Sequence, residues 1–205
     1  MENKIFEGRI IGSEEIKELK GSKLEMMGKC ICKLNGISVG TGFFTKINYK
    51  NELIPALITN FHVIDDEFFE KNKQLTFYIE GIRKSINIDK NRKIYSSKKD
   101  KYDIMIIKLK KEDEVNNFLE IDSNIFADNS ENFYKNEPIY LLHIPVFREP
   151  SFSSGVGFEK INEYDMKHKC NTDFCSSGGP IINYFTNRVI GIHKAYIKNI
   201  NEKKI

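Results

Sequence analysis

The hydrophobic positions of the chain fall into short segments rich in β-branched and aromatic residues, and polar turn sequences separate these segments. Segments of this kind are typical of β-strands, and Asn35-Gly36 between the first two is a strong hairpin signal. Strands at this spacing, without helices predicted between them, favour an all-β barrel or sandwich. The predicted strands are 29–34, 37–47, 54–60, 74–80, 82–88, 92–96 and 103–109, followed by 137–144, 151–161, 164–170, 179–184 and 187–197.

The segments outside these strands are mostly charged. Residues 1–27 are expected to form an N-terminal lead with a short helix around Glu14–Lys20, and Lys110–Leu119 is expected to be a charged connector. The charged runs 65–73 and 89–101 are predicted to be exposed loops, because charged side chains are rarely buried without a partner.

The composition excludes several classes of function. A length of 205 residues is enough for one compact unit or for two small halves that share a core. The 32 basic residues nearly balance the 29 acidic ones and form no basic stripe, so no nucleic-acid partner and no membrane partner are expected. The charged start of the chain lacks the apolar segment of a signal peptide, which predicts a cytoplasmic protein.

The cysteines narrow the chemistry further. Cys30, Cys32, Cys170 and Cys175 have C-x-C and C-x₄-C spacings that fit the common structural zinc patterns poorly. Disulfides are compatible with four cysteines, but a chain without a secretion signal is expected to keep free thiols in a reducing cytosol. Neither a metal nor another cofactor is therefore predicted.

Three segments carry candidate chemistry, and their order along the chain is informative. The stretch Cys175-Ser176-Ser177-Gly178-Gly179-Pro180 sets a serine in a tight turn that leads into a strand. Small residues there let a substrate carbonyl approach both a hydroxyl and backbone N–H groups. Upstream, His62 follows an apolar segment and Asp103 begins a β-branched run. The order His, Asp, Ser is that of the chymotrypsin arrangement.

Together with Gly40-Thr41-Gly42-Phe43-Phe44 and Val189–Lys194, these segments resemble a trypsin-like serine peptidase of the chymotrypsin fold. The resemblance is to the compact bacterial and intracellular branch that includes the glutamyl endopeptidases. It implies an all-β fold of two Greek-key antiparallel β-barrels, the first formed by residues 28–115 and the second by residues 116–205. That fold normally adds a strand and a helix after the segment that matches Val189–Tyr196, so the second barrel is expected to be incomplete at the C-terminus.

The resemblance implies a serine endopeptidase that hydrolyses a protein or peptide substrate through an acyl-enzyme. Ser177 is the expected nucleophile, His62 the general base, and Asp103 the group that orients the imidazole. The backbone N–H groups of Cys175 and Ser177 are expected to form the oxyanion hole. Because the family almost always has Gly at the position of Cys175, this residue predicts backbone strain and an enzyme that is slow, inactive or adapted in another way.

The resemblance also predicts a specificity. In glutamyl endopeptidases a Thr five residues before the nucleophile and a His in the strand lining the pocket bind the substrate side chain. Thr172 and His193 occupy these positions, and Asn171 stands where trypsin-type enzymes have their pocket Asp. Thr172 and His193 are therefore expected to be substrate-binding residues that favour Glu or Asp on the acyl side, with charge assistance from a protonated His193. The alternative is that Gly-Ile-His is generic to this branch.

Other interpretations of the sequence stay open. Cys175 and the short C-terminus also fit a catalytically weak or inactive peptidase-fold protein that binds protein segments, and a β-barrel binding module with chance motifs is a third option. Arg9-Ile10-Ile11-Gly12 resembles the cleavage site of secreted trypsins, but Ser176 stands where those enzymes have the partner Asp. Activation at Arg9 is therefore not expected. The sequence predicts no oligomeric state.

Overall fold

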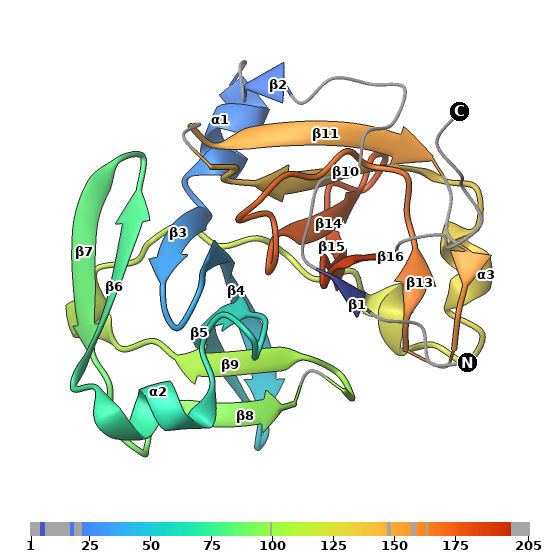
Figure 1. The fold of residues 1–205 in the computed structure, drawn as a ribbon. Coiled ribbons are helices and arrows are strands. Elements are labelled where there is room, and N and C mark those ends of the chain that lie inside the picture. Colours follow the sequence, from blue (N-terminus) through green and yellow to red (C-terminus); the bar gives the residue numbers. More distant parts are fainter. Residues whose placement is uncertain are drawn as a thin grey trace.

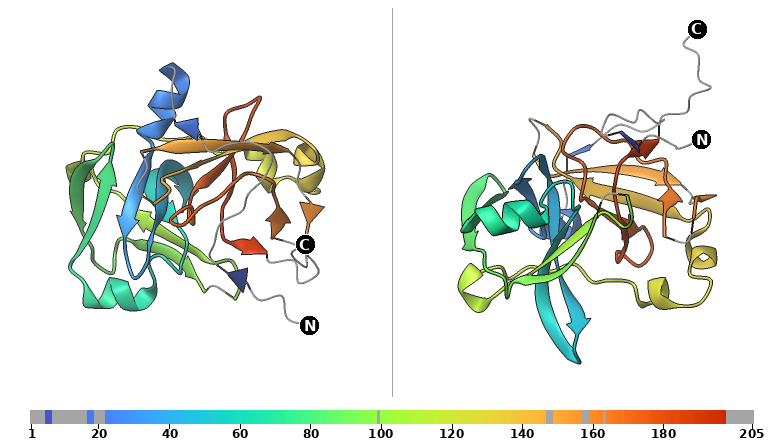
Figure 2. Two further views of the ribbon diagram at one scale, coloured as in Figure 1. Left: turned by 45° about the horizontal axis from the view of Figure 1, so that its top comes forward. Right: turned by 60° about the horizontal axis from the view of Figure 1, so that its bottom comes forward.

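Two antiparallel β-sheets form the framework of the fold. The structure is a computed structural model, and it describes residues 5–6, 17–18, 22–98, 100–146, 149–156, 159–162 and 164–197. Figure 1 shows the strands from β3 to β9 on one side of the molecule and those from β10 to β15 on the other. The two views of Figure 2 keep these groups side by side. The all-β class predicted from the strand pattern is confirmed.

The first sheet has seven strands in the order β7-β6-β3-β4-β5-β9-β8, with β7 and β8 as its outer strands. Each strand overlaps a predicted one, and β3 and β4 form the hairpin marked by Asn35-Gly36. The bounds are β3 (Ile31–Asn35), β4 (Val39–Tyr49), β5 (Glu52–Thr59), β6 (Gln74–Ile79), β7 (Ile82–Asn87), β8 (Lys93–Ser97) and β9 (Ile104–Lys108).

The second sheet has five strands in the order β15-β14-β10-β11-β2. Its strands are β2 (Lys17–Glu18), β10 (Pro138–His143), β11 (Ser151–Val156), β14 (Pro180–Asn183) and β15 (Val189–Ile192). Two short pairs accompany it, β1 (Ile5–Phe6) with β16 (Tyr196–Ile197) and β12 (Glu159–Lys160) with β13 (Met166–Lys167).

The N-terminal lead takes part in the second sheet. The helix expected around Glu14–Lys20 is wrong at Lys17–Glu18, because these two residues form strand β2 and pair with Phe152 and Ser151 of β11. The remaining residues of that segment lie outside the described residues, as do Arg9–Gly12 and residues 198–205. The division of the chain at residue 115 stays a prediction.

The helices are short. The structure describes α1 (Ser22–Gly28), α2 (Asp66–Lys71) and α3 (Glu131–Tyr134), with 3-10 turns at Lys111–Asp113 and Ser123–Phe126. None of the helices in the described part of the chain is long and apolar enough to cross a membrane.

Helix α2 corrects the expectation of an exposed loop at 65–73. The side chain of Asp65 accepts a hydrogen bond from the N–H of Phe68 at 2.7 Å, which caps the first turn. Asp66 and Glu67 lie in that turn and Lys71 lies in the last, as the helix dipole favours. The capping signal is present in the sequence, and the buried Phe69 ties the helix to the core.

The second charged run, 89–101, also departs from expectation. Arg92 is only 2% exposed, and its guanidinium makes two bonds to the buried carboxylate of Asp113, at 2.5 and 3.1 Å. The same carboxylate accepts the N–H of Lys110 at 2.7 Å. A buried charge needs a partner of this kind, and the partner lies 21 residues away in the sequence. No local pattern identifies the pair.

Several strands are buried on both faces, which explains their continuous apolar runs. In β4, Phe44 packs into the core enclosed by the first sheet, whereas its neighbour Phe43 packs into a second core shared with β10 and β14. In β10, Tyr140 and Leu142 join this shared core, and Leu141 faces a third cluster. The shared core fastens the two sheets together, and the candidate site lies along this junction.

Candidate active site

His62 lies in a turn directly after β5. The N–H of Val63 bonds to the carbonyl oxygen of Asn60 at 3.1 Å, which closes the turn. The hairpin loop between β3 and β4 holds it from outside, because Ile37 donates its N–H to the Val63 carbonyl at 3.0 Å and the Ser38 hydroxyl donates to the His62 carbonyl at 3.0 Å. The backbone of His62 is therefore held on both sides.

Asp103 meets His62 at the start of β9. Its Oδ2 lies 2.7 Å from His62 Nδ1, and its Oδ1 accepts the backbone N–H of His62 at 3.0 Å. Asp103 is fully buried with a φ of 53°, a left-handed conformation that Asp tolerates, and the side-chain amide of Asn60 donates to its carbonyl at 2.9 Å. The buried carboxylate places the imidazole proton on Nδ1, so Nε2 carries the lone pair.

The loop that carries Ser177 presses closely against β4. The carbonyl of Ser177 accepts the N–H of Thr41 at 2.8 Å, and the N–H of Gly178 donates to the carbonyl of His193 at 2.9 Å. Gly178 has a φ of 87°, and a Cβ there would lie 2.0 Å from the carbonyl oxygen of Thr41. Only glycine fits this close approach, which accounts for the glycine after the serine.

The hydroxyl of Ser177 does not bond to His62 in this structure. It donates to the carbonyl of Lys194 at 3.4 Å, which is long for such a bond. His62 Nε2 is buried and has no hydrogen-bond partner among the described residues. The structure thus joins His62 to Asp103 directly. It brings the Ser177 loop beside them through β4, where Gly40 faces both Val63 and the Ser177 carbonyl.

Cys175 occupies the strained position that the sequence predicts. The N–H of Ser176 bonds to the carbonyl of Asp173 at 3.1 Å, and Cys175 has a φ of 70° while Phe174 keeps a negative φ. These features define a type II turn, whose third residue is normally Gly or Asn. A left-handed Cys costs on the order of 1–3 kcal/mol and persists only where its surroundings hold it.

The orientation of the Cys175 N–H follows from its peptide plane. The carbonyl of Phe174 accepts the N–H of Val146 at 3.0 Å. In a trans peptide the C=O and N–H groups point in opposite directions, so the Cys175 N–H points away from Val146. The type II turn therefore fixes which side of the loop this donor faces.

A histidine that the sequence interpretation left without a role lies behind the loop. His143, fully buried at the end of β10, has its Nδ1 2.6 Å from Ser176 Oγ. The same Oγ accepts the N–H of Asp173 at 3.0 Å. Ser176 thus has a bonding role of its own.

Thr41 is a second residue whose contacts the sequence did not reveal. Its hydroxyl donates to the carbonyl of Cys175 at 2.7 Å and accepts the N–H of Ile144 at 3.0 Å. The residue is fully buried in β4. The motif Gly-Thr-Gly-Phe-Phe was noticed in the sequence, but only the fold places its threonine against the loop.

The two predicted substrate-binding residues, Thr172 and His193, are both buried, and His193 lies beside the loop. The N–H of His193 donates to the carbonyl of Gly179 at 2.8 Å, and its Nδ1 lies 3.0 Å from Nε2 of His168. Burial lowers the pKa of His168 to about 4, and burial together with the neighbouring histidines lowers the pKa of His193 well below its usual value. These shifts oppose the expectation of a protonated His193.

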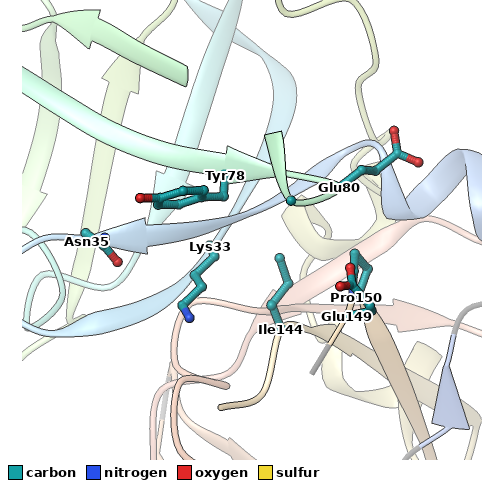
Figure 3. A pocket seen from close by; sticks show the side chains of 8 residues that line it. Lys33, Asn35, Tyr78, Glu80, Ile144, Glu149 and Pro150 are labelled. Atoms are coloured by element: carbon teal, nitrogen blue, oxygen red, sulfur yellow. The ribbon is translucent and has the colours of Figure 1, made fainter. Parts of the chain in front are cut away.

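A pocket of about 290 Å³ opens where the two sheets meet. Figure 3 shows Lys33, Tyr78 and Glu80 on the first-sheet side, with Ile144 and Glu149 facing them from the loop after β10. Its lining mixes charges of both signs. The lining of the pocket does not include His62 or Asp103. It does include Ile144, whose N–H donates to the hydroxyl of Thr41.

The cysteines behave as buried thiols. All four are free, and burial raises the pKa of Cys30 to about 11 and of Cys170 to about 12. Burial raises the pKa of Cys32 as well. These three thiols are therefore protonated at neutral pH and act as small apolar side chains. The described residues contain no group of His, Cys, Asp and Glu arranged to hold a metal ion.

Comparison with known proteins gives the family. A sequence model described as a trypsin-like peptidase domain matches residues 40–192. No curated protein matches the chain by sequence.

Solved structures resemble the fold. A serine endoprotease from Yersinia pestis superposes with a TM-score of 0.59 at 13% identity, over 86% of this chain but only 58% of that protein's chain. Deg5 gives a TM-score of 0.58 at 17% identity over 83% of this chain and 81% of its own, and the Rv3671c protease in its inactive form gives 0.53 at 14% over 82% and 78%. At these identities the likeness shows the fold alone, which is the chymotrypsin-like arrangement of two antiparallel β-sheets.

Proposed function

Since the chain belongs to the trypsin-like peptidase family, we propose that it is a serine endopeptidase that hydrolyses protein or peptide substrates. The observation that carries the proposal is the His62–Asp103 pair at 2.7 Å, with the Ser177 loop beside it. A cytoplasmic location belongs to the same proposal and rests on the sequence.

The proposed reaction begins with Ser177. Its hydroxyl turns from the Lys194 carbonyl toward His62 Nε2, which takes the proton while Oγ forms a bond to the scissile carbonyl carbon. Asp103 stabilises the imidazolium. His62 then gives the proton to the leaving nitrogen as the C–N bond breaks, and a water molecule, activated by His62, hydrolyses the acyl-enzyme and restores the Ser177 hydroxyl.

The backbone N–H groups of Cys175 and Ser177 are the proposed donors to the oxyanion. The type II turn at Cys175 supports this role, because it directs that N–H away from Val146 and because such donors act best when already oriented. The chemistry needs no metal and no other cofactor.

A serine-directed fluorophosphonate probe tests the proposed function. The folded wild-type protein should be labelled at Ser177, as mapped by peptide mass spectrometry, and Ser177→Ala should lose labelling and about 10⁶-fold in kcat. Ser154→Ala, on strand β11, is the control that should retain both. Labelling that survives in Ser177→Ala, or elsewhere in the chain, would contradict the assignment.

A second function has one observation in its favour. The Ser177 hydroxyl faces Lys194, and His62 Nε2 makes no hydrogen bond to a described residue, so the triad is incomplete as the structure stands. A peptidase-fold protein that binds protein segments without cleaving them would keep this arrangement. Folded wild-type protein that neither reacts with the probe nor cleaves a peptide library would favour this alternative.

The proposal extends to a preference for Glu or Asp on the acyl side of the bond. A neutral His168 that donates from Nε2 to His193 Nδ1 places the His193 proton on Nε2, where it is a donor for a substrate carboxylate. The hydroxyl of Thr172 is the second proposed donor. Because both imidazoles are neutral near pH 7, the preference relies on hydrogen bonds rather than on the charge of His193.

Matched substrates that differ only in Glu against Gln measure this preference. The wild type should favour Glu by at least about tenfold in kcat/KM, and His193→Ala should abolish the difference. The Glu-to-Gln ratio should stay constant between about pH 6.5 and 8.5, since the low pKa of His193 keeps it neutral there. Dominant cleavage after Lys, Arg or Leu would rule the preference out.

A further inference from the structure

His143, the last residue of β10, and Ile144, which follows it, connect to two consecutive residues of the Ser177 loop, the first directly and the second through Thr41. His143 Nδ1 lies 2.6 Å from the hydroxyl of Ser176 and is hydrogen-bonded to it. Ile144 donates its N–H to the hydroxyl of Thr41 at 3.0 Å, and that hydroxyl donates to the carbonyl of Cys175 at 2.7 Å. The end of one strand in the second sheet and one threonine of the first sheet thus close on the same turn.

Thr41 bonds to this turn through both its hydroxyl and its backbone N–H. Its hydroxyl both donates to Cys175 and accepts from Ile144, and its backbone N–H donates to the carbonyl of Ser177 at 2.8 Å. The residue is fully buried, so water does not replace these bonds. Thr41 therefore bonds to both residues whose N–H groups are proposed to hold the oxyanion, to Cys175 through its hydroxyl and to Ser177 through its backbone N–H.

The turn needs such support because of its own sequence. A Cys at a φ of 70° is strained, and relaxation of the turn to type I would return Cys175 to a negative φ. That change rotates the peptide plane between Phe174 and Cys175, and its N–H would then turn away from the side it now faces. A Gly at this position would hold the turn without external bonds.

We infer that Thr41 is a positioning residue that, with the His143–Ser176 hydrogen bond, holds the strained turn at Cys175 so that its N–H faces the oxyanion. The inference rests on the proposed function and adds to it a reason why this chain tolerates Cys where Gly is usual. The hydrogen bonds that hold the turn join Thr41, His143 and Ile144 to one another or to the loop, so the support comes from the chain itself.

Steady-state kinetics of Thr41 variants tests the inference. Thr41→Val keeps the shape but removes the hydroxyl, and kcat should fall by about 10²-fold with little change in KM, as expected when one oxyanion donor is misplaced. Thr41→Ser keeps the hydroxyl and should restore kcat to within about threefold of the wild type. A purely structural role would lower the melting temperature without this split between kcat and KM.

Thr45 offers a matched control on the same strand. It is also fully buried, and its hydroxyl also donates to a carbonyl at 2.7 Å, that of Leu119. Thr45→Val should therefore lower stability about as much as Thr41→Val while leaving kcat unchanged. Equal losses of kcat in the two variants would overturn the inference.

The double variant Thr41→Val with Cys175→Gly gives the sharpest result. Since Gly holds the turn without help, this double variant should recover at least about tenfold of the kcat lost in Thr41→Val. No recovery in a folded double variant would overturn the inference. If Thr41→Val does not fold, Ser176→Ala, which removes the bond to His143, takes its place in the same cycle.

The two proposals fail separately. A wild type that shows neither labelling nor cleavage overturns the proposed function. An active wild type whose Thr41→Val variant keeps its kcat overturns only the positioning role of Thr41.

Discussion

His62 and Asp103 meet across two neighbouring strands of one sheet, whereas the loop that carries Ser177 is held by groups from both sheets. The pairing of β5 with β9 places Thr59 opposite Met105, so His62, just beyond β5, comes within 2.7 Å of Asp103, just before β9. One antiparallel register is enough to assemble this pair. The Ser177 loop instead depends on β4, on the end of β10 and on the chain after β15.

The two regions also differ in how they accommodate a left-handed residue. Asp103 and Cys175 have φ values of 53° and 70°. Asp adopts this conformation at modest cost, whereas Cys does so only against a larger penalty. The His62–Asp103 pair therefore sits at a low conformational cost within the first sheet, whereas the strained loop depends on bonds from both sheets. Substitutions should accordingly act locally in the first region and through distant contacts in the second.

Among the substitutions that test this comparison, Asp103→Asn, which exchanges a carboxylate for an amide of the same shape, is expected to lower kcat the most. The amide keeps the shape and the bond to the His62 backbone, but it favours the wrong imidazole tautomer, so kcat should fall by about 10⁴-fold. Rate measurements at saturating substrate on folded protein decide this. Asp65→Asn is the control, because Asp65 is close to His62 in the sequence but caps helix α2. It should lower stability slightly and leave kcat unchanged.

The outcome of Asp103→Asn bears directly on the comparison. A loss of less than about tenfold would mean that Asp103 serves the fold rather than the reaction. The expected effect of Thr41→Val on the loop, about 10²-fold, lies below it because misplacing one donor leaves the general base intact.

The smallest expected effect is that of Cys175→Gly in the otherwise unchanged protein. The existing bonds already hold the turn, so kcat should stay the same or rise by a few-fold, and the relief of strain should roughly offset the greater flexibility of Gly in the unfolded chain. Kinetics and thermal unfolding of Cys175→Gly and Cys175→Ala together separate strain from the thiol. Cys175→Ala removes only the sulfur and keeps the strained Cβ.

A large loss of activity in both Cys175 variants would show that the thiol itself has a role. A loss in Cys175→Gly alone would show that a rigid residue is needed at the turn. Either result would weaken the contrast between the His62–Asp103 pair, which one strand pairing assembles, and the Ser177 loop, which contacts from both sheets hold.

Much of the first sheet, which carries His62 and Asp103, was predictable from the sequence because the signals for its strands and turns are local. Each apolar run, each strand start and the Asn35-Gly36 turn depends on only a few neighbouring residues. Every strand of the first sheet overlaps its prediction. The helix at 66–71 was also signalled, by the Asp65 cap and the charges of its turns, and the exposed-loop interpretation overlooked that signal.

The sequence by itself determined the strands of the first sheet, the all-β class and the order of His62, Asp103 and Ser177 along the chain. Only the tertiary structure decided that Arg92 is buried against Asp113, that His143 bonds to Ser176, and that Thr41 lies against Cys175. The physical reason is distance along the chain: the last contact joins residues 134 positions apart. Strand propensity is a property of neighbours, whereas a buried hydrogen bond exists only where packing brings its donor and acceptor together.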